Sequence, residues 1–153
     1  MLTVKSFLRD SKGDFIPLDQ AIPPVPDPDY VEGALEFTVD EVEILSLAHW
    51  DYIDQLWSYI INVLEELRAS GSASTRFPDQ PIELKFSRKG TLGVLVQSTV
   101  GGVTCSAMVR EGELMSALRD SGMKFFQCME SLVPESAAFH ASELDRLLVN
   151  CER

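Results

Sequence analysis

Carboxylates are the side chains most able to do chemistry in this chain, with 24 Asp and Glu against 13 Lys and Arg and a formal net charge of −11 in 153 residues. Asp51 and Asp54 are spaced as a carboxylate pair one helical turn apart. We expect both on the solvent side of a helix, where neither gains the raised pKa that a general acid needs. Their simpler role there is to complement the positive end of the helix dipole. We therefore assign no catalytic residue and expect the protein not to be an enzyme.

Metal and phosphate chemistry find little support in the sequence. Asp27, Asp29 and Glu32 offer close-set oxygens, but the run PDPDYVEG lacks the spacing and the distal glutamate of a calcium-binding EF-hand loop. His49 and His140 fit no zinc-ligand spacing. Neither a phosphate-cradling glycine motif nor a Gly-x-Ser-x-Gly elbow occurs. We expect no metal and no cofactor, although sequence alone does not reveal a triad assembled in space.

The surplus of negative charge limits the classes of partner. Nucleic acids and anionic membranes are bound mainly by cationic surfaces, and the basic residues of this chain are scattered, with only Arg88 and Lys89 adjacent. We therefore expect neither nucleic acid nor a membrane as a partner. A basic protein, in contrast, would be attracted from a distance.

Cysteine use and the amino-terminal sequence predict a cytoplasmic protein. Cys105, Cys128 and Cys151 are widely spaced and form no CxxC pair, which favours reduced thiols. The run MLTVKSFLRD lacks the apolar stretch of a signal peptide. No segment approaches the ~20 apolar residues of a membrane-spanning helix.

Hydrophobic periodicity predicts the elements that position these residues in the first half of the chain. Residues 2–9 and 31–39 alternate between apolar and polar, as half-buried strands do. A tight turn follows the second of them and leads to a return strand at 43–45. Five prolines within 17–29 predict an extended surface loop. Apolar residues at spacings of three and four predict a helix over 47–69.

The second half begins with a small-residue linker at 70–75 and contains a helix over 112–132 and a short helix over about 140–151. An antiparallel meander of three strands is expected at 82–88, 92–99 and 103–109. The predicted fold class is α+β, in a single domain over residues 1–153. An antiparallel sheet of about 5–6 strands carries two long helices and the short C-terminal helix on one face.

Two segments, WDYIDQLWSYI and FPDQPIELKF, are similar to segments of small uncharacterised bacterial α+β proteins, a resemblance that covers positions 30–90. In size and acidity the chain also resembles, as a class, the immunity proteins of bacterial toxin–immunity systems. That resemblance implies a protein that neutralises a basic toxin domain by occluding its active cleft. It transfers no functional residue, because immunity proteins share no single motif.

We predict an acidic protein-binding module whose partner is a basic protein. An immunity protein that neutralises a basic toxin domain is one such module. Complementary charge raises association rates to about 10⁸–10⁹ M⁻¹s⁻¹ at low salt, and an aromatic anchor slows dissociation. The predicted partner-binding residues lie at the hairpin tip and on the outer side of the first helix: Asp40, Glu41, Glu43, Asp51, Tyr52 and Asp54.

Two other functions stay open at this point. A small-ligand-binding protein or enzyme would place its pocket between sheet and helices, near Trp50, Trp57 and Cys105. A homo-oligomeric structural protein would expose an apolar patch on the free face of the sheet, with Phe7, Leu95 and Met108 as candidates.

Overall fold

Two antiparallel sheets and three α-helices make up the structure, which confirms the predicted α+β class. The computed structural model describes residues 1–149 in full and the backbone of residues 150 and 151. The first sheet has the strand order β2-β1-β3-β4, with β5 paired to β3. Its strands are β1 (Leu2–Arg9), β2 (Phe15–Pro17), β3 (Glu32–Val39), β4 (Val42–Leu45) and β5 (Asp51–Tyr52).

The second sheet has the strand order β6-β7-β8-β9. Its strands are β6 (Ser72–Arg76), β7 (Ile82–Arg88), β8 (Val94–Val100) and β9 (Val103–Val109). The helices are α1 (Ile53–Ser70), α2 (Glu111–Leu132) and α3 (Ala137–Cys151), and the short 3-10 turns are η1 (Leu18–Gln20), η2 (Leu47–His49) and η3 (Pro134–Ser136). Among the described residues, no helix combines the length and apolarity that a membrane span requires.

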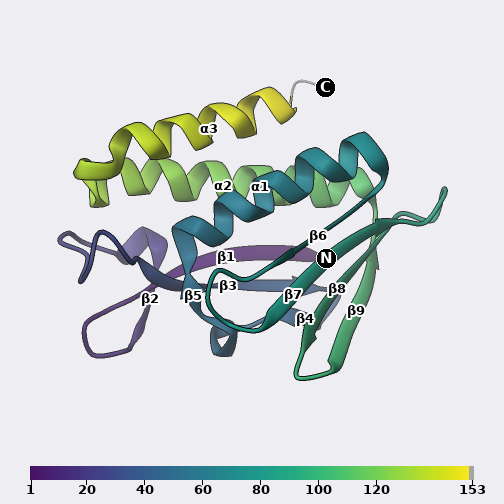
Figure 1. Ribbon diagram of the computed structural model, residues 1–153, viewed down its shortest axis with the longest axis horizontal. Coiled ribbons are helices and arrows are strands. Elements are labelled where there is room, and N and C mark those ends of the chain that lie inside the picture. The colour runs from purple at the N-terminus through teal and green to yellow at the C-terminus, as the bar shows by residue number, and fades with distance from the viewer. Residues whose placement is uncertain (152–153) are drawn as a thin grey trace.

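The three helices lie on one side of the strands, as predicted, with α1 and α2 next to the strands and α3 outermost (Figure 1). The expected single sheet is wrong, because the strands divide into two sheets. β4 ends the hydrogen-bonded path of the first sheet and lies across the second one. There the Ser98 hydroxyl donates to the Ile44 carbonyl at 2.6 Å, and the Cys105 thiol donates to the Glu43 carbonyl at 3.4 Å.

The hairpin between β3 and β4 forms where the sequence predicts it. Asp40 and Glu41 have φ values of 45° and 74°, so both turn residues are left-handed. This pair of conformations is typical of a type I′ turn, whose twist matches that of the two flanking strands. Side chains other than glycine and asparagine adopt it at a cost, because Cβ approaches the following carbonyl oxygen.

Helix α1 begins at Ile53, six residues later than predicted from its apolar stripe. The residues before the helix form a 3-10 turn and a short strand instead. Ser46 caps η2, where its hydroxyl accepts from Ala48 N at 3.2 Å and its backbone N–H donates to His49 Nδ1 at 2.9 Å. Asp51 then pairs with β3 as part of β5. The predicted end is correct, since Gly71 with a φ of 83° terminates the helix.

The prediction of a linker at 70–75 is wrong, because Ser72–Arg76 forms strand β6 beside β7. The strand contributes one buried apolar side chain, Ala73, while Ser72 and Ser74 are exposed. Such a segment carries little hydrophobic signal, and it is held in the sheet by pairing with β7.

Trp57 of α1 stands at the centre of the core. Its indole Nε1 donates to the hydroxyl of Ser6 on β1 at 3.1 Å, and its ring stacks on Phe125 of α2 with centroids 6.1 Å apart. Gly122 allows this close approach of α2, since a Cβ there would lie 3.0 Å from Trp57 Cζ3 and 2.9 Å from Leu147 Cδ1 of α3. One glycine thus lets all three helices meet.

Candidate functional site

The six predicted partner-binding residues form two groups at opposite ends of β3. The hairpin tip follows the carboxyl end of the strand, whereas Tyr52 pairs with Glu32 at its amino end. The 8 residues of β3 span roughly 25 Å at the usual rise of an antiparallel strand. The structure therefore does not bring the two groups together on one contact surface.

The hairpin tip is exposed at Asp40, Glu41 and Glu43. One of its charges is already compensated, because the amino group of Met1 donates to Asp40 Oδ1. This hydrogen bond raises the pKa of the amino group. Glu41 and Glu43 remain as the negative charges that the tip presents to a partner.

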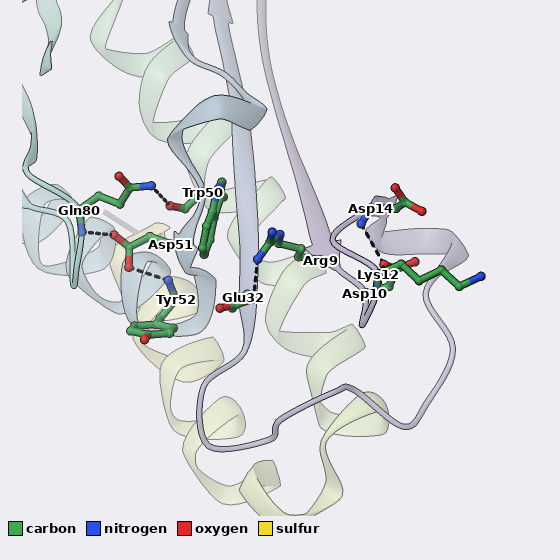
Figure 2. Close-up of polar contacts among 9 residues, drawn as sticks. All are labelled: Arg9, Asp10, Lys12, Asp14, Glu32, Trp50, Asp51, Tyr52 and Gln80. Atoms are coloured by element: carbon green, nitrogen blue, oxygen red, sulfur yellow. Dashed lines mark hydrogen bonds and ion pairs between the residues drawn. The ribbon is translucent and has the colours of Figure 1, made fainter.

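Asp51 is buried, so its predicted place on the exposed side of a helix is wrong. Its side chain is 2% exposed. The carboxylate accepts backbone N–H groups from Tyr52 at 2.7 Å and from Gln80 at 2.8 Å (Figure 2). It also accepts the backbone N–H of Asp79 at 3.1 Å. Gln80 Nε2 also donates to the Trp50 carbonyl at 2.8 Å. Asp51 thus fastens the loop between β6 and β7 to β5 and has no surface to offer a partner.

Asp54 lies half-buried in the first turn of α1, where its carboxylate accepts from Gln55 N at 2.9 Å. Desolvation raises the pKa of this carboxyl group. The expectation that a carboxyl group here keeps its ordinary pKa is therefore wrong. The helix end is therefore less open than the periodicity suggests.

A cleft of about 870 Å³ lies beneath the proline loop, residues 21–31. We call it the loop cleft. Prolines in this loop lack N–H donors and do not extend the sheet, so the loop stands away from the strands and leaves the space between. The loop side is lined by Ile22, Pro24, Val25, Asp27 and Tyr30, and the strand side by Leu8, Arg9, Glu32 and Tyr52, among others.

Arg9, at the end of β1, supplies a positive charge to the wall of the loop cleft. Its guanidinium carbon lies 4.2 Å from the centroid of the Trp50 ring, and its Nη1 donates to Glu32 Oε1 at 3.1 Å (Figure 2). Its Nε is buried without an acceptor among the described residues. The guanidinium is thus held between an aromatic face and a carboxylate, which largely neutralises it.

A second aromatic surface lies at the mouth of the loop cleft. The rings of Tyr30 and Tyr52 have centroids 5.3 Å apart and are tilted by 53°, and Tyr30 is 55% exposed. The pKa of Tyr52 is raised, first by desolvation and then by the negative charges of Asp79, Glu32 and Asp51. The same charges favour a cation at this position.

Negative charge prevails around the cleft. Asp10, Asp27 and Glu32 line it against the single cation Arg9 among the described residues. Asp10 and Asp27 each accept a backbone N–H two residues ahead, at 2.9 and 3.0 Å, which fixes the turns that carry them. The described residues contain no group of three or more His, Cys, Asp or Glu side chains that could hold a metal ion.

The residues expected around a central pocket do not converge. Trp50 stands under Arg9 beside the loop cleft, Trp57 is in the core, and Cys105 contacts β4. Cys105 and Cys128 are free thiols, and the side chain of Cys151 lies outside the described part of the chain.

The residues expected to form an apolar oligomerisation patch are also separated. Leu95 and Met108 are neighbours in register on β8 and β9, whereas Phe7 belongs to the other sheet. Gln97 and Ser106 are the next pair along the same face, so polar side chains interrupt the surface.

Sequence reasoning missed the loop cleft. The proline run was the available signal, because a segment without N–H donors stands apart from a sheet. Comparison with known proteins adds no assignment: no protein-family model, curated protein or solved structure matches this chain.

Proposed function

We propose that this protein is an acidic protein-binding module whose partner carries a positively charged surface and docks at the mouth of the loop cleft. The observation that carries the proposal is a packed tyrosine pair, exposed at Tyr30 and half-buried at Tyr52, beside several carboxylates of which only Glu32 has an ion-pair partner among the described residues. We call this surface the acidic rim, formed by Asp27, Asp29, Tyr30, Glu32, Tyr52 and Asp79.

Three carboxylates of the rim take part in none of the ion pairs of the described residues. Within the described residues, Asp27, Asp29 and Asp79 are exposed and form no ion pair. On the helical side, some acids are paired: Arg88 pairs with Glu111 at 2.6 Å. Arg146 likewise pairs with both Glu65 and Glu143. Uncompensated charge on one end of a protein produces a field that steers an oppositely charged partner.

The tyrosine pair supplies the second half of the proposal. Tyrosine is enriched among residues that dominate the binding energy of protein interfaces, where it buries a large rigid ring and keeps a polar hydroxyl. Tyr30 and Tyr52 already pack on each other, so little freedom remains to be lost when a partner covers them.

The narrower form of the proposal is an immunity protein that neutralises a basic toxin domain. An acidic surface occupies a phosphate-binding cleft by presenting carboxylates where the nucleic acid would present phosphates. The sequence resemblance to immunity proteins as a class and the charge of the rim support this form, and it specifies the partner as a nuclease-type domain with a basic active cleft.

Association kinetics with purified basic toxin domains test the proposal. The rim variant replaces Asp27, Asp29 and Asp79 with Asn. We expect its association rate to fall about tenfold at low salt and the difference to shrink as salt is added. The dissociation rate should rise instead when the ring of Tyr30 is removed by Tyr30→Leu.

Two variants with the same change in net charge serve as controls. One neutralises the hairpin tip through Asp40→Asn, Glu41→Gln and Glu43→Gln. The other neutralises exposed acids of the helical side through Glu66→Gln, Glu135→Gln and Asp145→Asn. Equal loss in all three variants would show that only total charge matters and would remove the rim from the proposal, while loss in the tip variant alone would move the surface to the hairpin.

A second candidate function is binding of a small ligand, with or without catalysis. The volume of the loop cleft, about 870 Å³, falls within the range of roughly 300–1,000 Å³ typical of small-molecule sites. Stabilisation of the chain by a metabolite mixture, lost on filling the cleft with Ala21→Trp, would favour this function over the protein-binding one.

A further inference from the structure

The loop cleft contains two aromatic surfaces that differ in one respect. The Trp50 ring is covered by the guanidinium of Arg9, 4.2 Å away. The Tyr30–Tyr52 pair is covered by no cation among the described residues, although the negative charges of Asp79, Glu32 and Asp51 act on Tyr52. The chain therefore fills one of two positions suited to a cation over an aromatic ring and leaves the other open to solvent.

Carboxylates flank the open position. Asp27 and Glu32 line the cleft beside the two tyrosines. Glu32 binds Arg9 through Oε1, and within the described residues no hydrogen bond to its Oε2 is present. A cation over the tyrosines would thus have an aromatic face on one side and carboxylates beside it, which is the arrangement that Arg9 already has with Trp50 and Glu32 (Figure 2).

We infer that the Tyr30–Tyr52 end of the loop cleft receives one arginine or lysine side chain from an extended segment of the partner. This inference rests on the proposed function and specifies how the basic partner is recognised. The apolar lining from Ile22, Pro24 and Val25 accommodates the aliphatic part of such a side chain, while its charged end reaches the tyrosines and the carboxylates.

A peptide segment fits the surroundings better than a free amine. Asp29 and Asp79 are exposed outside the cleft, beside Tyr30 and Tyr52 respectively. They are placed to meet basic residues next to the one that enters the cleft. A single small cation would use the cleft and leave these outer carboxylates without a partner.

Titration of the ¹⁵N-labelled full chain, followed by NMR, tests this inference with a designed probe. The arginine peptide is acetyl-Ser-Lys-Ser-Arg-Ser-Lys-Ser-amide, and its control carries citrulline in place of arginine. Citrulline keeps the shape and removes the charge. We expect shift changes centred on Tyr30, Val31 and Tyr52, with about tenfold weaker binding of the citrulline peptide.

Paired substitutions separate the ring from the hydroxyl. Tyr52→Leu should weaken the arginine peptide about threefold to tenfold, whereas Tyr52→Phe, which keeps the aromatic face, should leave its affinity within about twofold. Because Tyr52 is only half-buried, both variants are expected to fold, and their thermal unfolding curves verify it. Equal losses in the two variants would overturn the role of the aromatic face.

The remaining outcomes distinguish this inference from the proposed function. Agmatine carries the guanidinium without the peptide and should bind at least tenfold more weakly; equal affinity would make the cleft a site for free amines. If the arginine and citrulline peptides bind alike while the rim variant still slows capture of a basic protein, the cleft inference fails and the proposed function stands. If neither effect occurs, both fail.

Discussion

Removing the Asp51 carboxylate should unfold the chain at markedly lower denaturant, although the position looks like a surface acid in the sequence. The carboxylate receives three backbone N–H groups at 2.7 to 3.1 Å. Two of them, from Asp79 and Gln80, belong to the loop between β6 and β7. Asp51 therefore links a loop of the second sheet to β5 of the first, and its loss affects both sheets.

The size of the effect follows from the hydrogen bonds that are lost. A hydrogen bond to a charged group contributes about 1.5–3 kcal/mol. In Asp51→Ala the Asp79 and Gln80 donors lose their acceptor, but this loop is partly exposed and water replaces some of the lost bonding. We therefore expect a loss of about 3 kcal/mol rather than the sum of three bonds. Asp51→Asn keeps one acceptor oxygen and should lose about 1–2 kcal/mol.

Urea unfolding, followed by tryptophan fluorescence, measures the loss. With a slope of about 2 kcal/mol per molar for a domain of this size, the midpoint of Asp51→Ala should fall by roughly 1.5 M. Asp29→Asn is the matched control, since Asp29 is an exposed acid of the same region, and its midpoint should stay within about 0.25 M. A change below about 0.5 kcal/mol in Asp51→Ala would refute the structural role given to this carboxylate.

Four further outcomes are expected from single features. Burial lowers the pKa of His140, so below pH 6.5 the unfolded chain binds a proton that the folded chain does not bind, and the free energy of unfolding should fall from pH 7 to pH 5. His140→Phe should reduce this pH dependence, as measured by urea midpoints. The part that remains is due to His49, whose pKa is also lowered by desolvation. Glu41→Gly should stabilise the hairpin by about 1 kcal/mol, because glycine adopts the φ of 74° without steric cost. An unchanged thermal midpoint would contradict the conclusion that the backbone of Glu41 is strained. Gly122→Ala should destabilise by about 1–3 kcal/mol through contacts with Trp57 and Leu147, as differential scanning calorimetry would show. Ser6→Ala should cost about 1–2 kcal/mol by leaving the buried Trp57 N–H unpaired, whereas Ser6→Thr, which keeps the hydroxyl, should cost less in the same measurement.

Most strands and helices could be predicted because their burial patterns are regular. β1 alternates over its 8 residues, β3 alternates from Leu35 to Val39, and α2 repeats buried residues mostly every three or four positions. Periodicity reports which side of an element is buried, and it does not report which strands share hydrogen bonds. The division of the strands into two sheets therefore could not be predicted from periodicity. Ser98 and Cys105, whose side chains bond to β4, differ from their neighbours in no way that the sequence reveals.

The candidate site was the hardest part to predict, because its contacts connect distant parts of the chain. Asp51 and Gln80 are 29 positions apart, and Arg9 and Glu32 are 23 apart. Local pattern placed Asp51 on a helix, where an acid at that spacing is common. The tertiary contact with the loop between β6 and β7 instead draws it into β5, and the helix starts only after it.

The burial of Asp51 changes how charge should be interpreted at this end of the molecule. By holding the loop of Asp79 against Tyr52, one inaccessible carboxylate determines where an accessible one stands. Its own charge acts on Tyr52 as well. Substituting Asp51 would therefore alter the position of the acidic rim and its field together, and a loss of binding would not separate the two causes. Asp79→Asn changes the charge alone, because Asp51 is held by the backbone N–H of residue 79 and not by its side chain. If Asp79→Asn slows association with a basic partner and leaves the urea midpoint unchanged, the field of the rim acts independently of the scaffold that supports it.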